Sequence, residues 1–132
     1  MKNIPNQFFY SKKEDRLNFF SHGIGFILSI IGLIFLLKKS LVDFDINRFS
    51  GFLIYGLSLS IMYIASTLYH SSRTPQSRYR FRLFDMISIY LLIAGSYTPF
   101  TLTVLIDNGG LTLFILVWLI AISGIIWKIF TV

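Results

Sequence analysis

Residues 111–130 read LTLFILVWLIAISGIIWKIF, a run in which Lys128 is the only charged side chain. A helix rises 1.5 Å per residue, so about 20 apolar residues cross a hydrocarbon core of ~30 Å. Three more mostly apolar runs of similar length precede it, at residues 19–37, 50–70 and 84–105. None alternates strictly between apolar and polar residues as a membrane β-strand would. The chain is therefore predicted to be an all-α integral membrane protein with four transmembrane helices.

The composition supports this class. Of the 132 residues, 55% are apolar and only 14% are charged, whereas about a quarter of the residues in an ordinary globular chain are charged. These values exclude a soluble enzyme, a disordered protein and a collagen-like repeat. The chain has no cysteine, which excludes disulfides, cysteine-ligated zinc and a thiol nucleophile.

We expect residues 1–18 to form a cytoplasmic N-terminal segment and residues 19–132 a single transmembrane domain. Ser11 and Glu14 have the spacing of a capping box, so the first helix is predicted to begin near Ser11. The run at residues 19–37 is too long for the apolar region of a signal peptide and is expected to stay in the mature protein.

The distribution of Lys and Arg predicts the orientation. Nine of them fall in the N-terminal segment, the second connection and the C-terminal end: Lys2, Lys12, Lys13, Arg16, Arg73, Arg78, Arg80, Arg82 and Lys128. Three fall on the opposite side: Lys38, Lys39 and Arg48. The positive-inside rule thus predicts that both termini are cytoplasmic, in the inner (plasma) membrane of the cell.

The stretch Arg78-Tyr79-Arg80-Phe81-Arg82 interleaves bases with aromatics. A platform for single-stranded nucleic acid can have this pattern. Since it connects two apolar runs, we interpret it instead as an anchor that meets anionic lipid headgroups. The expected partner is the lipid bilayer, and no nucleic acid is expected.

Two patterns predict how the helices meet. Asn108-Gly109-Gly110 predicts a tight connection between the third and fourth runs. Small residues four positions apart, Gly25 with Ser29 and Gly56 with Ser60, predict close contact between neighbouring helices.

Ionisable residues inside a span are costly, so each one is a candidate for function. With a cytoplasmic N-terminus, His22, His70 and Asp85 all lie near the cytoplasmic face. Ser66 is four residues before His70 and shares its helix face. We therefore predict a cluster of Ser66, His70 and Asp85 at one depth.

Each residue also has a structural interpretation. His22 is expected to be structural, and His70 could face headgroups. The hydroxyl of Ser66 could bond back to the Met62 carbonyl. Asp85 could pair with Arg82, one turn earlier.

Histidine beside a carboxylate is typical of a zinc site. His70 and Asp85 are the candidate metal ligands, but a catalytic zinc usually takes three protein ligands and one open position. Only Asp107 follows Asp85 as a further acid or histidine, and it belongs to the opposite side of the membrane. The predicted zinc site is therefore incomplete within this chain.

These residues resemble the hemolysin III family, the bacterial branch of the group that includes the progestin and adipoQ receptors. The resemblance covers nearly the whole chain from Glu14 onward. It rests on Glu14-Asp15-Arg16-Leu17-Asn18, Ser21-His22-Gly23-Ile24-Gly25, Ser66-Thr67-Leu68-Tyr69-His70, Asp85, the stretch from Ile89 to Phe100, Trp118, Ala121 and Gly124.

The resemblance implies a seven-helix fold with a cytoplasmic N-terminus and a zinc site near the cytoplasmic face. The family pattern is Ser-x3-His on the second helix, Asp on the third and His-x3-His on the seventh. Ser66 and His70 match the first element and Asp85 the second. The chain corresponds to the first four helices, so His-x3-His is absent from it. It is similar to a truncated member, or to one whose remaining half is encoded separately.

Three functions follow as hypotheses. The first is a zinc-dependent membrane hydrolase, in which zinc lowers the pKa of a bound water to about 7 for attack on a membrane lipid. His70 would then be a ligand, Asp85 would hold or deprotonate the water, and Ser66 would support the site. The second is a cytolytic or channel-forming protein, and the third is a fragment without independent activity that inserts in the membrane and forms homo-oligomers.

Overall fold

A computed structural model describes residues 10–131 as an all-helical structure. The helices are α1 (Lys12–Leu41), α2 (Ile46–Ser71), α3 (Pro75–Leu102) and α4 (Leu111–Thr131), and a π-helical turn, η2 (Ile106–Gly110), leads into α4. Each of the four is long and apolar enough to cross a membrane, which confirms the predicted fold class. Most of the N-terminal segment, including Lys2 of the charge count, lies outside the described residues.

Polar side chains define where three of the helices begin. Ser11 caps α1 as predicted: its hydroxyl accepts a hydrogen bond from the Glu14 backbone N–H at 3.3 Å, and the Glu14 carboxylate accepts one from the Ser11 backbone N–H at 2.8 Å. Asp45 caps α2, and Thr74 caps α3, in which Pro75 occupies the first turn. These caps satisfy backbone donors that have no partner inside the helix. They allow the first two connections to be short.

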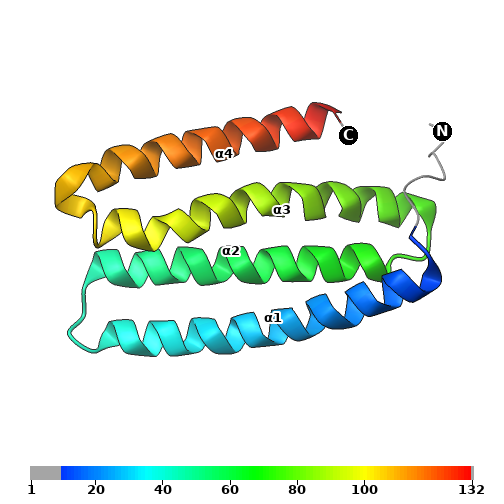
Figure 1. Cartoon of the computed structure of the whole chain (residues 1–132), viewed down its shortest axis with the longest axis horizontal. Helices are drawn as coiled ribbons and strands as arrows, with labels where there is room; N and C mark the ends of the chain where they lie inside the picture. The colour runs from blue at the N-terminus through cyan, green and yellow to red at the C-terminus, as the bar shows by residue number, and fades with distance from the viewer. Residues whose placement is uncertain (1–9, 132) are drawn as a thin grey trace.

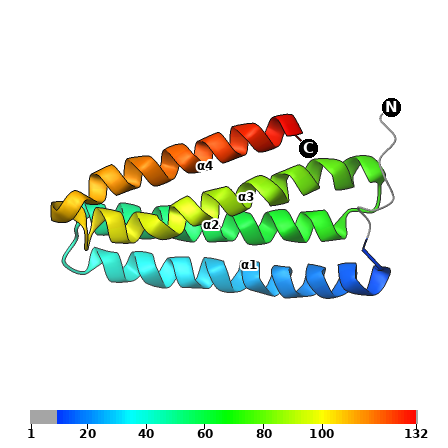
Figure 2. The same cartoon turned by 45° about the horizontal axis from the view of Figure 1, so that its top comes forward.

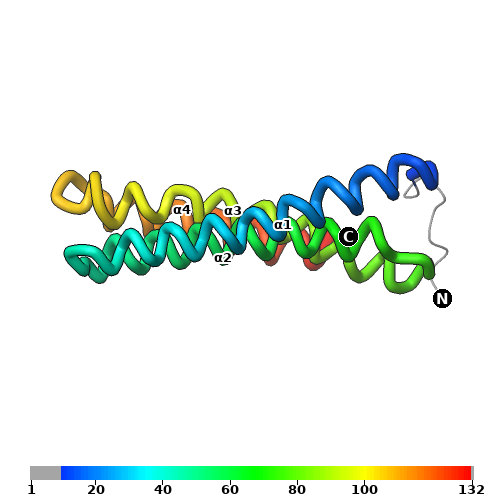
Figure 3. Tube along the Cα trace, turned by 90° about the horizontal axis from the view of Figure 1, so that it is seen from below, coloured from blue at the N-terminus to red at the C-terminus, as the bar shows by residue number. Residues whose placement is uncertain are grey.

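The helices are arranged in an open row in chain order (Figure 1). α1 packs on α2, α2 on α3 and α3 on α4, and within residues 10–131 no contact joins α1 to α4. The start of α1 and the end of α4 lie at the same end of the row (Figure 2). Figure 3 shows the first turns of α1 leaning away from α2 at that end. Because the row does not close, long apolar faces of α1 and α4 remain exposed.

Small residues bring neighbouring helices together, as the sequence predicts. The Ser29 and Ser60 hydroxyl oxygens are 2.9 Å apart across the contact between α1 and α2. In the same contact Gly56 faces Leu33 so closely that no Cβ would fit without movement. Between α2 and α3, Gly51 lies directly against Pro99. The packing therefore depends on small side chains at the crossing points.

The third connection differs from the predicted boundary. The apolar run was expected to continue as helix to residue 105, but α3 ends at Leu102. The reversal needs more of the chain, because Gly109 adopts a φ of 83° and the Gly110 N–H donates to the Leu105 carbonyl at 2.7 Å. A Cβ on Gly110 would overlap the Thr101 carbonyl oxygen. The two glycines are thus required by this turn.

Gly95→Ala should destabilise the contact between α2 and α3. A Cβ at this position would lie 2.6 Å from the Ser58 Cβ, so the helices must separate, at a cost of about 1–3 kcal/mol. The measurement is the free energy of unfolding in SDS-containing mixed micelles.

Gly32→Ala is the matched control, because no atom lies within 4 Å of the Cβ it would carry. It should leave the unfolding free energy unchanged or raise it. Equal destabilisation by both substitutions would show that close packing at Gly95 is not important.

Candidate functional site

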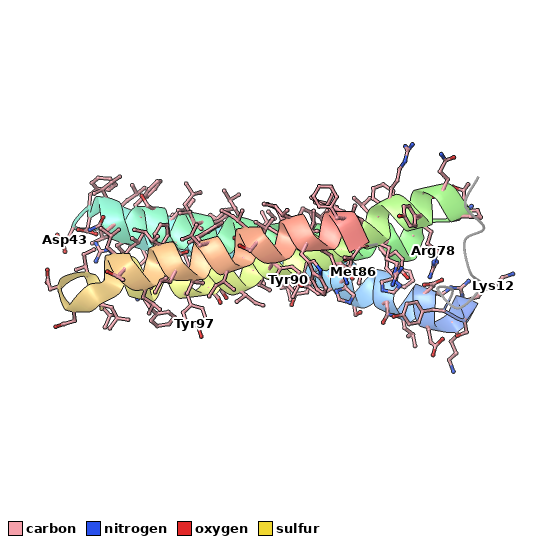
Figure 4. The ribbon with its side chains drawn as sticks, turned by 90° about the horizontal axis from the view of Figure 1, so that it is seen from above. Lys12, Asp43, Arg78, Met86, Tyr90 and Tyr97 are labelled. Atoms are coloured by element: carbon pink, nitrogen blue, oxygen red, sulfur yellow. The ribbon has the colours of Figure 1, made fainter. Side chains whose placement is uncertain are left out.

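A polar cluster forms where the start of α1, the end of α2 and the start of α3 meet. Asp15 and His22 come from α1, Ser66 and His70 from α2, and Arg78 and Asp85 from α3. Figure 4 shows Arg78 and Lys12 at this end of the row and Asp43 at the other. We call these six residues the polar cluster.

The carboxylate of Asp15 joins the three helices. Its Oδ1 lies 2.9 Å from His70 Nδ1 and 2.8 Å from Arg78 Nη2, and its Oδ2 lies 2.8 Å from Arg78 Nη1. The exposed fractions of the His70 and Arg78 side chains are only 7% and 6%. Such a bidentate, charge-assisted pair is among the strongest of hydrogen-bond arrangements. Asp15 thus holds α1 against both other helices.

This geometry corrects the interpretation of Arg78. The sequence indicated an anchor facing lipid headgroups, but Arg78 is buried and both of its terminal nitrogens bind Asp15. The prediction was wrong for this residue because its charge is neutralised inside the helix contact. Arg80 of the same stretch is exposed.

Asp15 also fixes the orientation of the His70 ring. An ionised carboxylate only accepts hydrogen bonds, so Nδ1 of His70 is the donor in this pair. The other ring nitrogen, Nε2, is then the one left for a different partner. Metal-binding histidines commonly donate their second nitrogen to a carboxylate in this way. His70 therefore has the orientation of a metal ligand that binds through Nε2.

The predicted trio of Ser66, His70 and Asp85 is brought together. Asp85 lies close enough to Ser66 and to both histidines for its carboxylate to interact with them electrostatically. Ser66 is 4% exposed. The three residues share one depth in the row, while their chemical roles stay predictions.

The ring of His22 contacts two aromatic rings of α2. Its ring is nearly parallel to that of His70, with ring centroids 6.0 Å apart and an interplanar angle of 17°. On its other side it contacts Tyr63, at a centroid distance of 5.9 Å. Its Nδ1 is buried and has no hydrogen-bond partner among residues 10–131. Burying a nitrogen without a hydrogen-bond partner costs free energy. Nδ1 of His22 therefore still needs a hydrogen-bond partner.

The described residues supply only part of a metal site. They contain no group of three or more His, Cys, Asp or Glu side chains placed to bind one ion. His70 and Asp85 supply donors of the types zinc prefers. The donor atoms are thus of the types that bind zinc, but there are too few of them to complete a zinc site.

Sequence reasoning missed Asp15 and the inward position of Arg78. Arg78 was counted as a charge outside the spans, Asp15 entered only through the motif that carries the family resemblance, and the two are 63 residues apart in the chain. One signal was available, since Asp15 lies seven residues before His22 and so shares its helix face at a spacing of two turns. No local pattern indicated that Arg78 would turn inward.

The fold and the cluster together define a multi-pass helical membrane protein with a buried ionic cluster at one end. Residues 10–132 match the family described as Haemolysin-III related, and the chain belongs to this family.

Two proteins from Bacillus species are similar to this chain over most of its length. The chain is 44% identical over 120 residues to "Hemolysin-3" of Bacillus cereus, covering 91% of this chain and 55% of that protein. It is 39% identical over 123 residues to "Hemolysin-3 homolog" of Bacillus subtilis (strain 168), covering 93% of this chain and 58% of that protein. The chain thus spans little more than half the length of these relatives. No solved structure matches it.

Asp15→Asn should destabilise the protein by about 2–4 kcal/mol, because it leaves the buried Arg78 charge without its counter-ion. The free energy of unfolding in SDS-containing mixed micelles measures this. Asp107→Asn is the control, since Asp107 lies at the other end of the row and is exposed.

A double-mutant cycle isolates the pair. The double variant Asp15→Leu with Arg78→Met should lose less unfolding free energy than the two single variants lose together. The expected difference is about 0.5–3 kcal/mol. Strictly additive losses would mean that the two side chains do not interact in the membrane.

Proposed function

We propose that this chain supplies one half of the zinc site of a membrane-embedded hydrolase that acts on a lipid amide or ester. The observation that carries the proposal is the hydrogen bond of 2.9 Å between His70 Nδ1 and the Asp15 carboxylate. It leaves Nε2 as the ring nitrogen that can bind another partner, as expected for a histidine that binds a metal.

Each residue then has a role. His70 is the metal ligand and Asp15 positions it. Asp85 lies beside both histidines and is the candidate second ligand, or the group that holds and deprotonates the attacking water. Ser66, beside Asp85, supports its carboxylate. Zinc, when bound, supplies the positive charge that activates water and polarises the carbonyl of the substrate.

The remaining ligands must come from outside the described residues. Since the chain spans only 55% and 58% of the two relatives, we propose that a further segment, or a separately encoded C-terminal half, packs on the open row and brings them. A second copy of this chain is the alternative partner.

The charge distribution supports a cytoplasmic position for the cluster. The described bases Lys12, Lys13, Arg16, Arg73, Arg78, Arg80, Arg82 and Lys128 lie at the cluster's end of the row, and Lys38, Lys39 and Arg48 at the other. We therefore propose that both termini face the cytoplasm, in the plasma membrane.

Zinc binding to the purified chain tests the proposal. We expect the metal-stripped chain in nanodiscs to take up zinc weakly, His70→Ala to abolish the uptake, and Asp15→Asn to lower the affinity about 10–100-fold. Elemental analysis after dialysis against defined free zinc gives these values.

Asp107→Asn is the matched control and should bind zinc like the unmodified chain. Zinc content that does not change in His70→Ala, or no zinc uptake by the unmodified chain, would contradict the proposal.

The printed name of the Bacillus cereus relative, "Hemolysin-3", makes pore formation the natural competitor. In this chain the polar cluster is confined to one end, and the helices form a row rather than a ring. We therefore expect liposomes loaded with dye to retain it at high protein-to-lipid ratios. Leakage that depends on protein concentration would favour the cytolytic alternative instead.

A further inference from the structure

A cavity of about 750 Å³ opens beside the polar cluster, between the first turns of α1 and the connection from α2 to α3. Its volume falls within the range of ~300–1,000 Å³ typical of small-molecule sites. It lies where the first turns of α1 lean away from the other helices (Figure 3). His70 and Asp15 of the proposed metal site lie in its lining, whereas Lys12, Arg16 and Arg73 have no part in that site.

The lining of the cavity is strongly basic. Lys12, Arg16 and Arg73 line it together with the ion pair of Asp15 and Arg78. Asp15 is the only acid in the lining, and Arg78 and His70 already bind it. Within residues 10–131, no ion pair joins Lys12, Arg16 or Arg73 to an acid. The cavity therefore carries an uncompensated positive charge.

The lining also indicates what kind of anion fits. Phe19 and Tyr10 form an apolar wall, with 36% and 51% of their surfaces exposed. Phe19 begins the apolar run of α1, so the cavity lies at the boundary between hydrocarbon and headgroups. A ligand there would have a phosphate for the guanidinium groups and acyl chains that continue along α1. Arg binds phosphate with two parallel hydrogen bonds.

We propose that this cavity binds the headgroup phosphate of an anionic phospholipid, with Arg16 and Arg73 as the phosphate ligands. Basic pockets at the cytoplasmic ends of transmembrane helices are suited to such headgroups. Neither arginine has a role in the proposed zinc site, so this proposal stands whether or not the metal binds.

The test uses short-range fluorescence quenching in bilayers. Phe19→Trp places a reporter in the cavity wall, in a chain whose own Trp118 and Trp127 are changed to Phe. Nanodiscs of phosphatidylcholine receive either brominated phosphatidylglycerol or brominated phosphatidylcholine, with a chelator present. We expect brominated phosphatidylglycerol to quench the reporter at least about fivefold more effectively than brominated phosphatidylcholine.

Matched double variants separate a site from a general surface charge. In the double variant Arg16→Gln with Arg73→Gln, the two brominated lipids should quench the reporter almost equally. The double variant Arg16→Lys with Arg73→Lys should retain part of the preference for phosphatidylglycerol. Lys13→Gln with Arg80→Gln removes two charges from the same end but outside this cavity, and should change the preference less than twofold. Unfolding in SDS checks that all variants are folded.

Two outcomes would overturn the proposal. An equal loss in both Gln double variants would mean that surface charge alone attracts the lipid. Relief of quenching by excess inorganic phosphate would mean that the cavity takes a soluble anion rather than a lipid.

Discussion

The carboxylate of Asp15 is the contact on which the polar-cluster end of the helix row depends. It binds a buried arginine from α3 and a buried histidine from α2, at distances of 2.8–2.9 Å. An arginine at this depth is tolerated only when it is paired, so Asp15 stabilises the contact among the three helices. The same bonds set the orientation of His70. Helix packing and the chemistry of the site therefore depend on one side chain.

The open row is consistent with our proposal that the cluster is one part of a metal site. The backbone of each helix approaches only those of its neighbours in chain order, and the Asp15–Arg78 pair is a side-chain link between α1 and α3. Within residues 10–131, Nδ1 of His22 is buried and has no hydrogen-bond partner. The apolar faces of α1 and α4 are exposed along much of their length. These features agree with a segment that spans little more than half of its relatives' length. A partner that covers the row would also bring further side chains to the cluster.

Much of this could be predicted from the sequence because membrane helices obey strong local rules. The lengths of the apolar runs predicted the four helices. The pair Ser11 and Glu14 predicted the first helix cap, and Gly56 with Ser60 predicted a close contact between helices. The depth argument placed Ser66, His70 and Asp85 together. The bond between Asp15 and Arg78 could not be predicted, because charge counting treats every Lys or Arg as a surface charge and the two residues are far apart in the chain.

In this structure Asp15 holds His70 by Nδ1, which leaves Nε2 as the ring nitrogen for another partner. Solid-state ¹⁵N NMR of the chain in bilayers tests it directly, since the only other histidine is His22 and His22→Gln assigns the signals. In mildly alkaline, metal-free buffer we expect His70 to be protonated at Nδ1, with a chemical shift that Asp15→Asn changes. A His70 protonated at Nε2 alone, or a spectrum that Asp15→Asn leaves unchanged, would contradict the account.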